Sequence, residues 1–111
     1  MVPEKHIGFM RAYTFDRTYQ FLFSIEELNI TDVLVFTIIY NYNLTTPECF
    51  IGQETISKKL NVTSRTVRNS LSRLEKIGLL NVVHRNGYTN IYEANYERLE
   101  EFACKYDKGL C

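Results

Sequence analysis

Cysteine is too scarce and too scattered in this chain of 111 residues to predict a metal site. The three cysteines, Cys49, Cys104 and Cys111, include no CxxC pair, and neither His6 nor His84 lies at metal-ligand spacing from them. We therefore expect no bound metal, and we expect the cysteines to be buried or free thiols.

Long apolar runs are missing as well, which argues against a membrane-spanning helix. The longest apolar stretch, residues 33–42, is about half of the roughly 20 residues that a membrane span needs. The chain also lacks an opening leader of basic, apolar and small residues. A hydrophobic content of 45% argues against disorder, so we expect one soluble, cytoplasmic domain over residues 1–111, with no membrane partner.

The short motifs of enzymes are absent too. The sequence contains no Gly-rich phosphate loop, no nucleophile elbow and no HExxH motif. We therefore expect neither catalytic residues nor a bound cofactor, and we infer no small-molecule ligand.

Neither sign of charge is in excess over the whole chain, because thirteen basic residues balance thirteen acidic ones. The distribution is nevertheless uneven. Residues 53–90 contain seven basic and two acidic residues, a net charge of +5, and the rest of the chain carries the compensating −5. Such asymmetry indicates a polyanionic partner on one face, although clustered charge is more often only a solvated helix surface.

The N-terminal segment alternates between aromatic and polar residues. From Phe9 to Phe23 this period of two predicts one extended strand, or a hairpin that turns near Asp16 and Arg17. An aromatic stripe can also stack single-stranded bases, but few basic residues are interleaved here. We therefore expect the aromatic side chains to cover a core.

Two helix starts follow in quick succession. Ser24 and Glu27 match a capping box, which predicts a short helix that ends near Asn29. Thr31 is the expected N-cap of a longer helix over residues 32–42. Apolar residues occupy nearly all sides of this longer helix, so we expect it to be the buried centre of the domain. We expect the turn-forming residues that follow to end it.

The next segment predicts two helices joined by a tight turn. The first covers residues 53–60, and Asn61 can end it in the left-handed conformation that a tight helix end requires. Thr63 is the expected N-cap of the second helix, and Gly78 is expected to close it. Two short helices in this arrangement form a helix-turn-helix.

A hairpin and a further helix complete the predicted elements. The segments LLNVVHR and YTNIYE flank an Asn-Gly pair, the strongest short-range signal for a two-residue turn. The register of such a hairpin places Val82 opposite Ile91, and Arg85 opposite Tyr88. Residues 95–106 then predict an acidic amphipathic helix, whose apolar face either forms a homodimer interface or packs within its own chain.

The residues QETISKKLNVTSRTVRNSLSRLEKIGLL, followed by NVVHRNGYTNIYE, resemble the winged helix-turn-helix domains at the N-termini of phage and plasmid replication initiators. They resemble MarR-type repressors more distantly. The resemblance implies an α+β, mainly α fold, with a winged-helix core over residues 31–93. An N-terminal extension over 1–30 holds the aromatic strand or hairpin, and residues 94–111 hold the C-terminal amphipathic helix. It also implies a prokaryotic or viral protein that acts in the host cytoplasm.

The second helix of the motif has two chemically different faces. At about 100° per residue, Val67, Leu71 and Leu74 form one apolar stripe, and basic and hydrogen-bonding residues lie opposite them. Arg can bond to guanine and Asn to adenine with two hydrogen bonds each, and Ser or Thr can bond to base edges or phosphates. The candidate DNA-binding residues on this helix are Ser64, Arg65, Thr66, Arg68, Asn69, Ser72, Arg73 and Lys76, of which Arg73 and Lys76 are expected to contact phosphates.

Two further groups of side chains are candidates for contact with the DNA backbone or the adjacent groove. Arg85, Asn86 and Tyr88 stand at the tip of the predicted hairpin, where Arg85 can alternatively serve only to solvate an edge strand. Lys58 and Lys59 on the preceding helix are candidate backbone clamps.

The expected function is sequence-specific binding of double-stranded DNA. The recognition helix, residues 64–77, is expected in the major groove, and the wing, residues 85–88, on the adjacent groove or backbone. The resemblance implies a role in replication initiation of a mobile element or in transcriptional repression, with a possible homodimer through residues 95–106. The alternative is a protein-protein interaction module whose basic face binds an acidic partner and no DNA.

Overall fold

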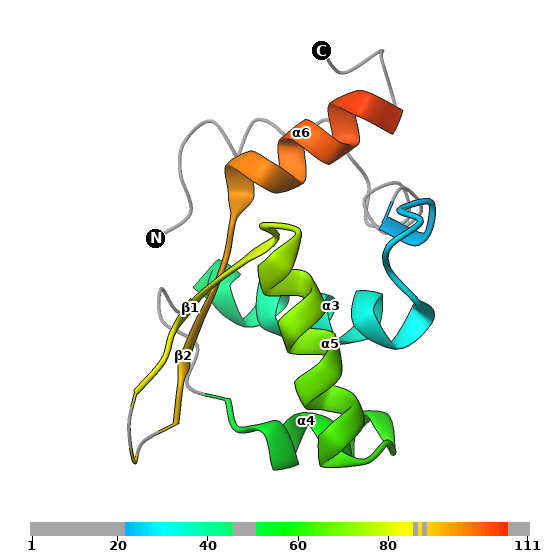
Figure 1. Ribbon diagram of the computed structural model, residues 1–111. Helices are drawn as coiled ribbons and strands as arrows, with labels where there is room; N and C mark the ends of the chain where they lie inside the picture. Colours follow the sequence, from blue (N-terminus) through cyan, green and yellow to red (C-terminus); the bar gives the residue numbers. More distant parts are fainter. Residues whose placement is uncertain (1–21, 46–50, 86, 88, 107–111) are drawn as a thin grey trace.

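Four helices and a two-stranded antiparallel sheet make up the computed structural model, which describes residues 22–45, 51–85, 87 and 89–106 (Figure 1). The fold is α+β and mainly helical, with the element order of a winged helix, as predicted. The elements are α3 (Ile30–Thr45), α4 (Gln53–Leu60), α5 (Ser64–Lys76), β1 (Leu80–Val83), β2 (Ile91–Ala94) and α6 (Tyr96–Tyr106).

The N-terminus of α3 is capped by Asn29 and not by Thr31. The side-chain oxygen of Asn29 accepts a hydrogen bond of 2.8 Å from the backbone N–H of Asp32, and the Asp32 carboxylate accepts one of 3.1 Å from the backbone N–H of Asn29. This reciprocal arrangement satisfies two backbone donors at once. The helix predicted between Ser24 and Asn29 is wrong, because residues 24–29 form turns.

At its other end α3 extends to Thr45, past the turn-forming residues that were expected to end it. The reason is Asn43, which is buried and whose side chain bonds to the backbone of β2. Its Oδ1 accepts a hydrogen bond of 2.8 Å from the Ala94 N–H, and its Nδ2 donates one of 3.4 Å to the Tyr92 carbonyl oxygen. A residue that favours turns in isolation thus stays helical because its amide group connects α3 to the sheet.

Most of the aromatic strand or hairpin predicted between Phe9 and Phe23 lies outside the described residues. Its last two residues, Leu22 and Phe23, are helical, so the strand does not include them. Leu22 is fully buried, whereas Phe23 is 51% exposed, which is the reverse of the predicted alternation.

The core lies between α3 and α5 and continues under the sheet and α6. Phe36 is buried at its centre, and its ring stacks on Tyr40, whose ring in turn meets Tyr96 edge to face. The expectation that α3 is buried on all sides is wrong for its outer face. There Ile30 is 67% exposed and Leu34 is 41% exposed.

The predicted helix-turn-helix is confirmed at its local signals. Asn61 adopts the left-handed conformation with φ of 55°, and the Thr63 hydroxyl accepts a hydrogen bond of 3.2 Å from the Thr66 N–H. Gly78, with φ of 88°, closes α5. The N–H of Leu79 then bonds to the carbonyl oxygen of Leu74 at 3.0 Å, which is the hydrogen bond of a Schellman motif.

Replacing Thr63 with alanine should lower the free energy of unfolding by about 0.5 to 2 kcal/mol, because the first turn of α5 loses its side-chain acceptor. Urea denaturation followed by circular dichroism measures the change. Thr63→Ser is the matched control, since it keeps the hydroxyl. An equal loss in both variants would show that the methyl group, and not the cap, stabilises the helix.

The strand register of the hairpin differs from the predicted one by one residue. β1 and β2 pair with Val82 opposite Tyr92 and Leu80 opposite Ala94, so the prediction of Val82 opposite Ile91 is wrong. The observed register brings Leu80, Tyr92 and Ala94 together on the buried face. In the predicted register Tyr92 would stand opposite Asn81, which is exposed. Burial of the Tyr92 ring therefore outweighs the preference of Asn-Gly for a two-residue turn.

Helix α6 packs within its own chain, at the end of the molecule opposite α4 (Figure 1). Leu99 and Ala103 are fully buried in the common core. The Arg98 Nε donates a hydrogen bond of 3.0 Å to the carbonyl oxygen of Ile77, just after α5. Cys104 is disulfide-bonded, so the expectation of a buried or free thiol is wrong for this cysteine. Within the described ranges, no helix has the length and apolar character needed to cross a membrane.

Candidate nucleic-acid interface

Helix α5 presents one buried and one exposed face, and the predicted division between them is confirmed. Val67, Leu71 and Leu74 are buried against the core, and Ser70 joins them. The exposed positions of the helix are Arg65, Arg68, Asn69, Ser72 and Lys76. The turn at Asn61 and the cap at Thr63 set where the helix begins. The burial of its apolar stripe then decides which residues face solvent.

The exposed face of α5 is free to bind a ligand. Within the described part of the chain, no ion pair or hydrogen bond engages the side chains of Arg65, Arg68, Asn69 or Lys76. Arginine and asparagine side chains with unused donors are suited to base edges in the major groove, and a lysine is suited to phosphate.

The remaining polar residues near this face have different surroundings. Ser64 and Thr66 are half-buried at the N-terminus of α5, and the Thr66 hydroxyl oxygen lies 2.9 Å from that of Thr63. Lys58 and Lys59 are exposed on the last turn of α4, directly before the turn of the motif. The structure thus groups the two lysines with the N-terminal end of α5.

Arg73, which is predicted to contact phosphate, has an ion-pair partner within the chain. Its Nε and Nη2 donate hydrogen bonds of 2.7 and 2.8 Å to the two carboxylate oxygens of Asp32, whose side chain is completely buried. Burial raises the pKa of Asp32, but the hydrogen bonds from Arg73 and from the backbone N–H of Asn29 lower it by more. The pKa therefore lies below its ordinary value. The hydrogen bond to Asp32 also raises the pKa of Arg73. Sequence reasoning missed this pair because its members are 41 residues apart.

The lowered pKa of Asp32 predicts a loss of stability in acid. A carboxylate whose pKa is lowered by folding contributes stability that is present above its unfolded value, near 3.8, and lost as the pH falls through the folded pKa. In Asp32→Asn this contribution is absent at every pH. Urea denaturation from about pH 6 downwards should therefore show the two proteins converging in stability below about pH 4. A constant difference across that range would contradict the linkage.

The hairpin loop is held by Arg85 itself. Its Nε and Nη2 donate hydrogen bonds of 2.8 and 2.6 Å to the carbonyl oxygen of Thr89, and its backbone N–H donates one of 3.0 Å to the Asn90 side chain. Arg85 therefore stabilises the loop, in addition to any contact outside the chain. The other two predicted wing residues, Asn86 and Tyr88, lie outside the described residues, as does the predicted pairing of Arg85 with Tyr88.

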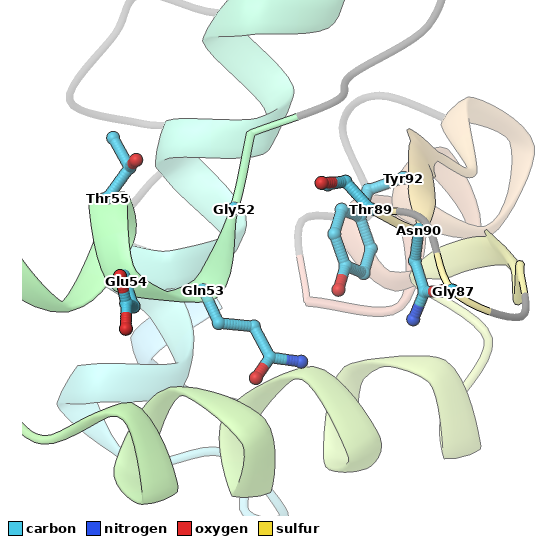
Figure 2. Close-up of a pocket in the computed structure, with 8 residues that line it drawn as sticks. All are labelled: Gly52, Gln53, Glu54, Thr55, Gly87, Thr89, Asn90 and Tyr92. Carbon is cyan, nitrogen blue, oxygen red and sulfur yellow. The ribbon is translucent and has the colours of Figure 1, made fainter.

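A groove separates α5 and α4 from the wing. One hollow of about 240 Å³ lies between α5 and the wing, where Arg68 and Ser72 stand opposite Asn90. At its edge the Nε2 atom of His84 lies 3.0 Å from a carboxylate oxygen of Glu75. A neighbouring hollow of about 540 Å³ lies between the N-terminus of α4 and the wing, with Gln53 on one side and Asn90 on the other (Figure 2).

Sequence reasoning missed Gln53, His84 and Asn90 as residues of this groove. They come from α4 and from both sides of the hairpin, and no local spacing connects them. The signal available in the sequence was their polar character next to predicted helix and turn boundaries. That signal is shared by most surface residues.

Comparison with known protein families gives a match to the part of the chain that contains α4 and α5. Residues 26–80 match a family model described as a helix-turn-helix domain. A search of curated proteins and a search of solved structures gave no significant match. The matched segment contains α3, α4 and α5 and reaches the first residue of β1. The match and the structure therefore agree on a helix-turn-helix fold in residues 26–80, followed by a hairpin in the position of a wing. DNA binding is the general function of helix-turn-helix domains.

Proposed function

We propose that this protein binds double-stranded DNA in a sequence-specific manner, with α5 in the major groove. The observation that carries the proposal is the exposed face of α5. It holds two arginines, an asparagine and a lysine without partners among the described residues, opposite the buried stripe of Val67, Leu71 and Leu74. A face built only for solubility usually mixes both signs of charge, whereas this one is basic and hydrogen-bonding.

Within this proposal the side chains have separate tasks. Arg65, Arg68 and Asn69 lie in the N-terminal half of α5, the part of a recognition helix that usually meets base edges. Lys76, at the C-terminal end, binds phosphate. Lys58 and Lys59 at the end of α4 contact the backbone beside the groove.

The wing contacts the adjacent groove or its phosphates through the loop over residues 85–88. The hydrogen bonds from Arg85 to Thr89 support this assignment, because they join the described residues on the two sides of the loop before DNA binds.

The biological role we propose is replication initiation of a mobile element or transcriptional repression. The resemblance of residues 53–93 to replication initiators, and more distantly to MarR-type repressors, supports these two roles. The two roles require different arrangements of the protein on DNA, because a repressor that binds a palindrome needs two copies related by a two-fold axis. Since the apolar face of α6 is buried in its own core, a dimer would need another surface or a rearranged α6.

The test is selection of bound duplexes from a random pool, with the mass of the free protein measured alongside. A palindromic consensus and a dimer would indicate a repressor, whereas direct repeats bound by a monomer would indicate an initiator. Absence of binding to any duplex at about 50 mM salt would refute DNA binding. The basic face would then be assigned to an acidic protein partner.

Lys76→Ala should weaken binding to all duplexes alike, because the lysine contacts phosphate and not bases. The slope of log affinity against log salt concentration should become shallower by about 0.9, the value for one lost phosphate contact. The matched control is Lys105→Ala, which removes an exposed lysine from α6, on the other end of the molecule from α4. Equal changes in both variants would show that only the total charge matters.

A further inference from the structure

We infer that the ion pair between Asp32 and Arg73 is a positioning pair, which sets the orientation of α5 for base recognition without touching DNA. The inference rests on the proposed function, because it assigns a task to residues behind the proposed recognition face. Asp32 is in the first turn of α3, and Arg73 is in the last turn of α5.

The Asp32 carboxylate accepts three hydrogen bonds, of which the two from Arg73 join α5 to α3. Asp32 accepts two from Arg73, at 2.7 and 2.8 Å, and one from the Asn29 backbone, at 3.1 Å. The carboxylate itself is held at the start of α3, because its residue belongs to the reciprocal cap with Asn29. The planar guanidinium therefore meets a fixed acceptor and is constrained in both position and angle.

The apolar stripe of α5 constrains the helix less specifically. Val67, Leu71 and Leu74 bury apolar surface against the core, but the hydrophobic effect is non-directional. A small rotation of α5 about its axis would keep most of that burial. The same rotation would break the two-point contact between Arg73 and Asp32, so this contact defines the rotation of the helix.

The two sides of α5 are held by different pairs. Arg73 and Glu75 are two positions apart and so lie about 200° apart around the helix axis. Arg73 connects one side of the helix to α3, and Glu75 connects the other side to the wing through His84. Both members of the Glu75–His84 pair are exposed, with 40% and 67% of the side chains accessible, whereas in the Asp32–Arg73 pair Arg73 is 41% accessible and Asp32 is completely buried. Since exposed pairs contribute little, the Asp32–Arg73 pair is the main constraint.

An ion pair that buries its carboxylate completely is a costly way to gain stability alone. Apolar residues of similar volume often stabilise a protein equally well or better. The orientation of a helix that reads bases has a narrow tolerance, because hydrogen bonds to base edges depend on both distance and angle. Flexible lysines that contact phosphates tolerate a tilted helix. Loss of the pair should therefore reduce specific binding more than non-specific binding.

The test uses the whole chain with Asp32→Asn, which keeps an acceptor for the Asn29 cap but removes the charge. At a temperature where every variant is folded, affinity for the selected duplex should fall about tenfold, while affinity for a scrambled duplex stays the same. Arg73→Lys should act in the same direction, because lysine keeps the charge but cannot form the two-point contact. Leu99→Ala, which lowers stability from within α6, should keep the ratio of specific to non-specific affinity.

An unchanged ratio in Asp32→Asn, or an equal fall in Leu99→Ala, would overturn the inference. A second measurement is independent of DNA. Residual dipolar couplings of the backbone amides report the orientation of α5 relative to α3 in the free protein, and they should change in Asp32→Asn. If the wild-type protein binds no duplex, the proposed function fails, whereas unchanged couplings refute the positioning role itself.

Discussion

Replacing both Arg65 and Arg68 with alanine is expected to remove most of the sequence preference of this protein. Both guanidinium groups are exposed on the N-terminal half of α5, and neither has a partner within the described ranges. An arginine that bonds to guanine through two hydrogen bonds contributes about 1 to 3 kcal/mol of discrimination against other bases. Each single variant should therefore lose about 1 to 3 kcal/mol of binding free energy for the selected duplex. The double variant should approach the affinity for scrambled DNA.

The comparison needs duplexes of both kinds and a control for charge. Affinities of the single variants for selected and scrambled duplexes, measured at one salt concentration, separate loss of base recognition from loss of charge. Lys105→Ala removes the same formal charge from α6 and should leave the discrimination intact. If Arg65→Ala and Arg68→Ala reduced both affinities equally, the two arginines would be phosphate contacts, and base recognition would have to lie elsewhere on the helix.

Replacing Leu74 with alanine should have the largest effect on stability. Leu74 is fully buried between α5 and the core, and a substitution of this kind lowers the free energy of unfolding by about 2 to 5 kcal/mol. Because domains of this size are stable by only about 5 to 15 kcal/mol, the variant should lose a large part of its stability. DNA binding should fall with it wherever part of the protein is unfolded.

Leu34→Ala is the matched control, since it makes the same chemical change on the exposed side of α3, where the side chain is 41% accessible. Its expected cost is about 1 kcal/mol or less. Urea denaturation of both variants measures the difference. Similar losses would mean that the outer face of α3 is covered in solution, for instance by a second copy of the chain.

The local signals in the sequence predicted the helix-turn-helix well. A hydroxyl at Thr63, a residue that tolerates positive φ at position 61 and a glycine at position 78 each act within a few residues along the chain. Such interactions can be recognised from the sequence, because the partners are neighbours in it. The apolar spacing of Val67, Leu71 and Leu74 likewise predicted which face of α5 is buried.

The errors have one physical cause in common. Ser24 and Thr31 are chemically sound caps, but Asn29 prevails because its partner Asp32 is also bound by Arg73 from another helix. The Asn-Gly turn is locally favourable, but the burial of Tyr92 sets the register. In each case a contact between distant segments outweighs a local preference of similar or smaller energy.

The sequence by itself determined the two helices of the motif, their caps and the basic face of the second helix, because these depend on spacing and on neighbouring residues. Only the tertiary structure decided which basic residues on that face are free. It turned Arg73 inward to a buried carboxylate and left Arg65, Arg68 and Lys76 without partners among the described residues. The physical reason is that a charged side chain pairs with an oppositely charged group that lies close to it in space. The packing of α5 on α3, and not the distance along the chain, decides which groups lie that close.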